Sequence, residues 1–309
     1  MSKQGSLITK YRPASFEEVI GQDAVVRSLE KVIEKRSSDA FLFTGPPGTG
    51  KTTLARLAAE ALGCLPGDLI EVDGATTSTK EEICSVLDGL MYRPLGAGAM
   101  KAVIIDECHA LSKAAITALL KSMEEPPAWV VWFLCTTEPT KVPVAIKTRC
   151  SAYQLKEVSF EVLCDLLEST AEAKDVDGKV IELCAEESNG SPRQALSNLG
   201  VCLAAADRKE AAELLRSAAD SKEAIDLARA LINGANWSDV KAILVALKET
   251  NPESVRHVVR AYTTAVVLNG KGKESESAFA ILDAFSTPFN SADGASPLVL
   301  ACGRLVFAE

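Results

Sequence analysis

The chain has 309 residues, of which 47% are hydrophobic and 24% charged, a composition typical of globular proteins that bury a core. Its length corresponds to two or three domains, and no apolar run approaches the ~18 residues of a membrane span, which excludes a membrane protein. The net charge of −9 is uneven: residues 1–150 hold 17 Lys and Arg against 18 Asp and Glu, and residues 151–309 hold 16 against 24. The near-neutral first half can therefore still present a basic face to nucleic acid.

The N-terminus lacks the apolar core of a signal peptide, so we expect a cytoplasmic protein. The nine cysteines are scattered without a C-x-x-C pair. This spacing favours reduced thiols, most of them buried as small apolar side chains, over disulfides or a zinc site.

Strand-like apolar runs alternate with helical patterns through the first half of the chain. Near-continuous apolar character in these runs indicates a parallel sheet that is covered by helices on both faces, hence an α/β fold. Five strands are expected, the last from a weaker signal: residues 41–43, 69–72, 102–105, 130–135 and 153–155.

A glycine-rich segment follows the first expected strand and precedes a helical pattern. It fits the phosphate-binding loop G-x-x-x-x-G-K-[ST], whose backbone N–H groups and helix N-terminus surround phosphate oxygens. We expect Lys51 to reach the β- and γ-phosphates of ATP and Thr52 to hold Mg²⁺. The residues expected around the nucleotide are Gly45, Pro46, Pro47, Gly48, Thr49, Gly50, Lys51, Thr52 and Thr53.

An acidic pair ends the third expected strand, at the sheet edge where open α/β sheets bind ligands. Asp106 would complete the Mg²⁺ site, and Glu107 would polarise the water that attacks the γ-phosphate. The alternative is a loop carboxylate pair without a catalytic role. Thr137 ends the neighbouring strand, where its hydroxyl could touch the γ-phosphate or that water, and His109 is expected to be an accessory residue.

Strand signals vanish after residue 155, and helices are expected near 159–172, 179–188 and 191–205. Thr79, Ser112 and Ser191 have the sequence context of helix N-caps, the first and last of them in capping-box form. Weak linker signals divide the remaining helical part at 218–221, 233–236 and 269–274.

Several segments together resemble the ATPase subunits of DNA sliding-clamp loaders. They are Lys10-Tyr-Arg-Pro-Ala-Ser-Phe, Asp106-Glu-Cys-His-Ala-Leu-Ser-Lys, Ala118-Leu-Leu-Lys-Ser-Met-Glu-Glu-Pro-Pro, Thr148-Arg-Cys and Gly190-Ser-Pro-Arg. The pattern is most similar to the bacterial gamma/tau type, with replication factor C small subunits and phage large subunits as relatives. The resemblance implies an AAA+ domain over 1–154, a helical lid over 155–217 and a helical collar for assembly over 218–309.

The resemblance also implies roles for individual residues. Thr137 would be the first sensor, Arg193 the second sensor on the lid, and Arg149 would reach the ATP of a neighbouring subunit. An internal salt bridge of Arg149 with a surface carboxylate is the alternative. The adenine and ribose would lie against Tyr11, Arg12, Val19 and Ile20.

Three lysines match basic positions of the family's DNA-tracking surface, although single lysines on helices are commonly just solvated. They are Lys80, Lys113 and Lys141. The segment Leu90-Met-Tyr92 lies where relatives contact the clamp, and core packing is the alternative for Leu90 and Met91. The cysteine-rich zinc module and the long C-terminal extension of gamma/tau are missing from this sequence, so zinc is not expected.

The resulting prediction is a DNA-stimulated ATPase in a ring-like pentamer with other clamp-loader subunits, several of them copies of this chain. ATP binding would open a sliding clamp and grip primer–template DNA, and hydrolysis would release the clamp, in the nucleoid or in a phage-infected cell. A non-hydrolysing structural subunit and another AAA+ machine, such as a branch-migration motor or an initiator loader, remain alternatives. A nucleotide kinase is disfavoured because no acceptor-binding insertion interrupts the sheet.

Overall fold

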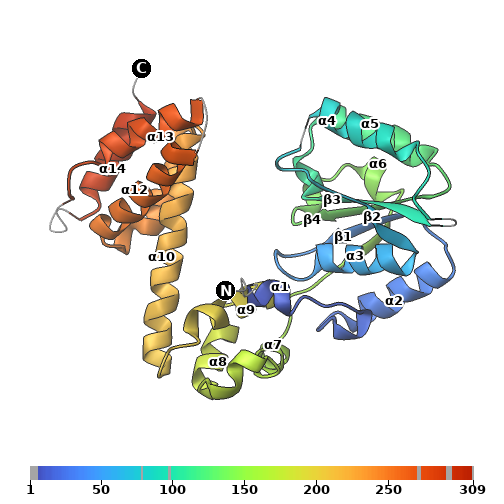
Figure 1. The fold of residues 1–309 in the computed structure, drawn as a ribbon, viewed down its shortest axis with the longest axis horizontal. Coiled ribbons are helices and arrows are strands. Elements are labelled where there is room, and N and C mark those ends of the chain that lie inside the picture. The colour runs from blue at the N-terminus through green and yellow to red at the C-terminus, as the bar shows by residue number, and fades with distance from the viewer. Residues whose placement is uncertain (1–5, 78, 97–98, 270–272, 290–293, 308–309) are drawn as a thin grey trace. The chain divides into compact units, whose positions relative to one another are not determined.

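A computed structural model describes residues 6–77, 79–96, 99–269, 273–289 and 294–307. The chain forms two compact units, residues 1–208 and residues 209–309 (Figure 1). The first unit contains the sheet and three lid helices, and the second is helical in its described residues. The predicted division into three domains at 154/155 and 217/218 stays a prediction.

The first unit is built on a five-stranded sheet of order β2-β3-β4-β1-β5, in which every neighbouring pair is parallel. All five expected strands are confirmed, and their observed bounds are β1 (Ala40–Thr44), β2 (Cys64–Asp73), β3 (Met100–Asp106), β4 (Val130–Thr136) and β5 (Ser151–Gln154). Strand β2 starts earlier than expected. It lies at a sheet edge, and its register shifts between Cys64 and Leu69, which allows the sequence Leu-Pro-Gly within it.

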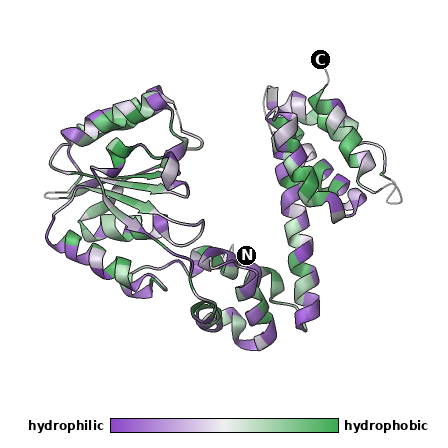
Figure 2. Cartoon of the chain, turned by 180° about the vertical axis from the view of Figure 1, so that it is seen from behind, coloured by the Kyte–Doolittle hydropathy of each residue, from purple (hydrophilic) through white to green (hydrophobic). Residues whose placement is uncertain are grey.

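Helices cover both faces of this sheet (Figure 1). Because side chains alternate along a strand, Phe41 and Phe43 pack on one face with Phe133, while Leu42 packs on the other with Trp132. Helices α2 (Asp23–Glu34) and α3 (Lys51–Ala61) cover the first face. The second face is covered by α4 (Lys80–Leu90), α5 (Lys113–Glu124) and α6 (Val144–Lys147). Figure 2 shows the hydrophobic colouring of the strands between these helices.

The expected N-caps start three of the helices. Thr79 and Glu82 form a reciprocal capping box at α4, and the Ser112 side chain accepts from the Ala115 N–H at α5. Ser191 accepts from the Gln194 N–H, but the second half of that capping box is wrong. The Gln194 amide instead donates to Asn198 one turn later, an i,i+4 contact on the same helix face.

Three helices form the lid: α7 (Phe160–Glu168), α8 (Gly178–Glu186) and α9 (Pro192–Cys202), with a short turn η4 (Ala171–Asp175) between the first two. The N-terminal helix α1 (Leu7–Lys10) packs on α9, and η1 (Phe16–Glu18) follows it. Two further short turns, η2 (Cys108–Ala110) and η3 (Pro139–Lys141), follow β3 and β4.

The second unit packs its helices around its own core, which includes Leu227, Val259 and Phe285. The linker expected at 218–221 is wrong, because these residues lie inside one continuous helix. Alanine-rich sequence favours helix there, and the Ser221 hydroxyl is accommodated by donating to the Ser217 carbonyl. The helices are α10 (Arg208–Ile232), α11 (Trp237–Ala246), η5 (Leu247–Glu249), α12 (Pro252–Asn269), α13 (Lys273–Ala284) and α14 (Ser296–Val306).

Candidate functional site

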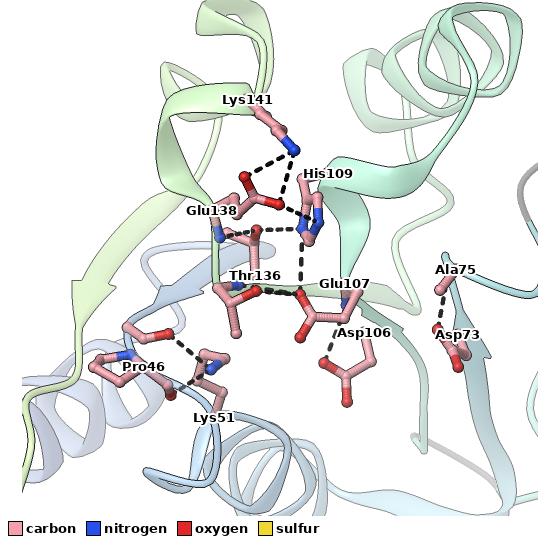
Figure 3. Close-up of polar contacts among 12 residues, drawn as sticks. Pro46, Lys51, Asp73, Ala75, Asp106, Glu107, His109, Thr136, Glu138 and Lys141 are labelled. Atoms are coloured by element: carbon pink, nitrogen blue, oxygen red, sulfur yellow. Dashed lines mark hydrogen bonds and ion pairs between the residues drawn. The ribbon is translucent and has the colours of Figure 1, made fainter. Parts of the chain in front are cut away.

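The carboxyl ends of the central strands bring the sequence motifs to one edge of the sheet. Thr44 at the end of β1 pairs with Thr136 at the end of β4, and Asp106 ends β3 beside it. The loop between β1 and α3 therefore faces the residues that follow β3 and β4 (Figure 3). This is the edge at which parallel α/β sheets bind their ligands.

The glycines of the loop after β1 have backbone conformations and neighbours that other residues would not tolerate. Gly45, Gly48 and Gly50 have φ angles of 143°, 74° and 104°. A Cβ atom on Gly45 would lie 2.5 Å from the Leu155 carbonyl oxygen, and one on Gly48 would lie 2.2 Å from the Ser191 hydroxyl oxygen. The sequence pattern of the loop therefore reflects left-handed backbone and close packing against the lid.

The Lys51 side chain is only 6% exposed and turns back over this loop. Its ammonium group donates to the Gly45 carbonyl at 2.9 Å and to the Pro46 carbonyl at 2.8 Å. Burial lowers the pKa of Lys51, although the nearby carboxylate of Glu107 opposes that shift. An ammonium whose hydrogen bonds both go to neutral carbonyls, with carboxylates near it but not hydrogen-bonded to it, is suited to pair with an anionic ligand.

The next residue, Thr52, is hydrogen-bonded to the acidic pair. Its hydroxyl donates to Asp106 Oδ2 at 2.7 Å. A hydroxyl and a carboxylate are the kinds of oxygen ligand that Mg²⁺ takes together with water and phosphate oxygens, so the two residues fit the ion. When bound, the ion would neutralise phosphate charge.

Glu107 is held in place by the end of β4. Its backbone is left-handed, with φ of 44°, and its Oε2 accepts from the Thr137 N–H at 3.1 Å and from the Thr137 hydroxyl at 2.9 Å. Left-handed backbone at a non-glycine residue is uncommon and occurs where surrounding contacts hold it. In this structure Thr137 therefore holds the Glu107 carboxylate through two hydrogen bonds.

A polar network extends from Glu107 to the surface (Figure 3). His109 Nδ1 lies 3.2 Å from Glu107 Oε2 and 2.9 Å from the Thr136 hydroxyl, and its Nε2 lies 3.1 Å from Glu138 Oε1. Lys141 pairs with Glu138 at 2.8 Å, and this hydrogen-bonded contact lowers the pKa of Glu138. Sequence reasoning left His109 without a role and missed Glu138, since nothing in a linear pattern pairs residues 29 positions apart.

A cleft of about 220 Å³ connects the glycine loop to the lid and to the N-terminal segment. Of the residues expected around a nucleotide, Gly45, Pro46 and Thr137 lie behind this surface, where they hold Lys51 and Glu107. Sequence reasoning missed six lid and N-terminal residues that complete the cleft, all of them apolar except Glu18. The expected residues that line it are Tyr11, Arg12, Val19, Ile20, Pro47, Gly48, Thr49, Gly50, Lys51, Thr52, Thr53, Asp106, Glu107 and Arg193; the missed ones are Ile8, Pro13, Glu18, Leu166, Pro192 and Leu196.

Two arginines and a lysine make one side of the cleft cationic, and a third arginine, Arg56, lies near them. Burial, with the neighbouring charges of Arg56 and Arg193, lowers the pKa of Arg12. Arg56 forms two hydrogen bonds to Glu71, at 2.6 and 2.5 Å, which neutralise part of this charge. Arg12 and Arg193 lie with Lys51 on the cleft itself, an arrangement that favours a polyanion.

The other residues singled out from the sequence do not line the cleft, and all of them except Leu90 lie at the surface. Arg149 is 36% exposed in its side chain and pairs with Glu124, as the internal-salt-bridge alternative expected. Leu90 is buried in the core, whereas Met91 is 71% and Tyr92 74% exposed. The lysines of the predicted DNA surface are all exposed: Lys80, Lys113 and Lys141.

Two features are absent from the part of the chain that the structure describes. Within these residues, no helix combines the length and the apolar character that crossing a membrane requires. The same part of the chain contains no cluster of three or more His, Cys, Asp or Glu side chains arranged to hold a metal ion.

The strand order, the glycine loop between β1 and α3 and the helical lid define the AAA+ class of P-loop proteins. The solved structure of the Thermotoga maritima RuvB Holliday junction branch migration motor has this fold. The matched region covers 77% of this chain and 85% of the RuvB chain, with a TM-score of 0.55 and 23% sequence identity. At that identity the similarity establishes the fold alone.

Within this class, the chain is similar in sequence to subunits of bacterial DNA polymerase III. A family described as DNA polymerase III, delta subunit, matches residues 67–159. DNA polymerase III subunit tau of Salmonella typhimurium is 35% identical over 225 residues, which cover 65% of this chain and 35% of that protein. Subunit tau of Bacillus subtilis is 34% identical over 218 residues, covering 63% and 38%. Subunit gamma of Buchnera aphidicola is 33% identical over 217 residues, covering 62% and 60%. The matches thus span between about a third and three fifths of the length of these relatives.

Proposed function

We propose that this chain is an ATPase subunit of a DNA polymerase sliding-clamp loader. It binds ATP and Mg²⁺ in the cleft, assembles with further clamp-loader subunits, opens the clamp and grips primer–template DNA. Hydrolysis then releases the loaded clamp.

The main support for this proposal is that four side chains lie together at the carboxyl-terminal edge of the sheet. Lys51, Thr52, Asp106 and Glu107 line the same cleft, although 54 residues separate the Thr52–Asp106 hydrogen-bonded pair. This set supplies a cation for the phosphates, two oxygen ligands for Mg²⁺ and a carboxylate for the attacking water. On the lid side, Arg193 offers a guanidinium to the same phosphates from the first turn of α9.

Glu107 would act as the residue that orients and polarises water. In this structure its Oε2 is occupied by two hydrogen bonds from Thr137 and faces His109. These contacts all use Oε2, so Oε1 is the oxygen that would accept a hydrogen bond from the attacking water. We propose that Thr137, as the first sensor, exchanges this contact for one with the γ-phosphate or the water.

Arg149 completes the proposal as a residue that acts on the neighbouring subunit. Its side chain lies at the surface, paired with Glu124 and with the Ala145 carbonyl, and is absent from the lining of its own cleft. A guanidinium presented in this way is suited to the γ-phosphate bound by an adjacent copy.

A non-hydrolysing structural subunit of the same assembly is the main rival. Loss of the loop lysine or the acidic pair would favour it, whereas both are present and positioned here. For the other AAA+ machines, the similarity to RuvB concerns the fold alone, and the tau and gamma subunits are more similar in sequence.

The test is ATP hydrolysis measured with the cognate clamp and primed DNA, for the wild type and for Glu107→Gln. The variant keeps the shape of the side chain but loses the charge that polarises water. We expect ATP binding to persist while turnover falls by ~10²-fold or more. Glu34→Gln, at an exposed position of helix α2, serves as the matched control. Wild-type turnover in Glu107→Gln would remove Glu107 from the mechanism, and absence of hydrolysis in the wild-type assembly would favour the structural subunit.

A further inference from the structure

The N-terminal residues 6–13, here called the strap, form one wall of the cleft. Ile8, Tyr11, Arg12 and Pro13 of the strap line it. The adjoining wall comes from the lid, so about 150 residues of chain separate two segments that form one continuous surface. Noncovalent contacts alone therefore hold this part of the cleft together.

Two sets of contacts join the strap to the lid. Helix α1 packs on α9, where the Leu7 side chain lies against Gly200. At the other end of the strap, the Tyr11 hydroxyl donates to Glu172 Oε2 at 2.6 Å and accepts from the Ala171 N–H at 2.7 Å. Lys10 pairs with Glu172 Oε1 at 2.6 Å. The contacts of Lys10 and Tyr11 with residues 171–172 are called the tether below.

The tether is charged across the neutral pH range. Hydrogen bonds from Lys10 and then from Tyr11 lower the pKa of Glu172 to about 2, and the contact with Glu172 raises the pKa of Lys10. Both oxygens of the Glu172 carboxylate are used, one by each partner. Hydrogen bonds that include an ionised acceptor are stronger and more directional than neutral ones.

The tethered residue Tyr11 is also one of the residues that line the cleft. Tyr11 lines the cavity, while its hydroxyl is held by hydrogen bonds to Glu172 and Ala171 of the lid turn η4. Opening this wall toward solvent therefore requires either the tether to break or the strap and the lid to move together.

We propose that Glu172 is a positioning residue that locks the Tyr11 wall to the lid and thereby sets the rate at which a bound nucleotide leaves. This inference rests on the proposed nucleotide site. It assigns Glu172 no contact with the nucleotide: the carboxylate acts through the phenol of Tyr11. Loss of the tether frees the strap from η4 while the glycine loop, Lys51 and the acidic pair keep their positions.

The experiment follows dissociation of a fluorescent ADP analogue, bound with Mg²⁺ to the full chain and displaced by excess unlabelled ATP. Tyr11→Phe keeps the ring and removes the hydroxyl, and Glu172→Ala removes the carboxylate. We expect each variant to release the analogue about five- to tenfold faster, the effect of losing one charge-assisted hydrogen bond. The acceleration in the double variant should be well below the product of the two single effects, because both changes remove the Tyr11–Glu172 hydrogen bond.

Two further variants separate a positioning role from a merely structural one. Glu172→Gln retains an oxygen that can accept from the phenol, so it should recover most of the wild-type dissociation rate. Glu182→Ala removes an exposed glutamate of lid helix α8 and should leave the rate unchanged.

The outcomes distinguish this inference from the nucleotide site on which it rests. If the wild-type chain binds no analogue, the proposed function fails. If the analogue binds and Lys51→Met abolishes that binding, but Tyr11→Phe and Glu172→Ala both release it at the wild-type rate, the tether alone is refuted. A double variant whose acceleration is the product of the two single effects would also refute it, since the residues would then act independently.

Discussion

Replacing Lys51 with methionine should affect the free and the nucleotide-bound protein in different ways. Methionine keeps an unbranched side chain of similar length and removes the charge. In the bound state, truncating one partner of a buried, hydrogen-bonded charge pair costs about 2–5 kcal/mol. We therefore expect ATP affinity to fall by at least ~100-fold, which corresponds to about 2.7 kcal/mol.

The free protein should respond in the opposite direction or not at all. Burial lowers the pKa of Lys51 below its ordinary value of 10.5, so the charged form is less stable in the folded chain than in the unfolded one. This penalty is fully present below the lowered pKa and disappears as pH rises toward 10.5. Its two carbonyl hydrogen bonds offset part of the penalty. Near neutral pH, Lys51→Met should unfold with a free energy within about 1 kcal/mol of the wild type or above it.

Isothermal titration with ATP and Mg²⁺ measures the first quantity, and urea unfolding without nucleotide measures the second. Thermal unfolding with ATP adds a consistency check, because a ligand that binds the folded state raises its stability. An ATP affinity within twofold of the wild type would refute the role of Lys51. A loss of more than about 2 kcal/mol of stability without nucleotide would show that the ammonium is a structural hydrogen-bond donor instead.

Three further predictions concern the loop, the subunit interface and DNA. Gly48→Ala should weaken ATP binding and destabilise the fold by about 1–2 kcal/mol, because the φ angle of Gly48 is 74° and the new Cβ atom would lie 2.2 Å from the Ser191 hydroxyl oxygen of the lid. An unchanged ATP affinity would contradict the close packing. Mixing Arg149→Ala subunits with Lys51→Ala subunits should restore part of the DNA-stimulated hydrolysis that each lacks alone, and no recovery in co-assembled rings would leave Arg149 with a local structural role. Replacing the exposed lysines should flatten the log–log salt dependence of DNA binding by up to about three units per subunit, whereas Lys31→Ala with Lys35→Ala, at the C-terminal end of α2, should not. An unaltered slope would place DNA elsewhere. The lysines replaced are Lys80, Lys113 and Lys141.

The elements of the first unit were largely predictable because they depend on short-range patterns. The five strands follow from apolar runs, and the caps at Thr79 and Ser112 from residues three positions apart. The loop glycines were predictable from the phosphate-loop motif, and in the structure they adopt positive φ angles. The linker expected at 218–221 was wrong because it rested on local composition alone. Composition did not reveal that α10 continues to Ala224 and Leu227, which pack in the second core.

Local sequence by itself therefore determined the α/β class, the phosphate loop and the acidic pair, since each is written in adjacent residues whose backbone and chemistry decide the outcome. Only the tertiary structure decided which partners those residues have. His109 reaches Glu138 across two strand ends, and Tyr11 reaches Glu172 across 161 residues. Arg149 pairs with Glu124 and does not line the cleft of its own chain. Such pairs depend on how the sheet and the lid bring distant segments together. The sequence around a polar side chain does not indicate which distant residue will become its partner in the folded protein.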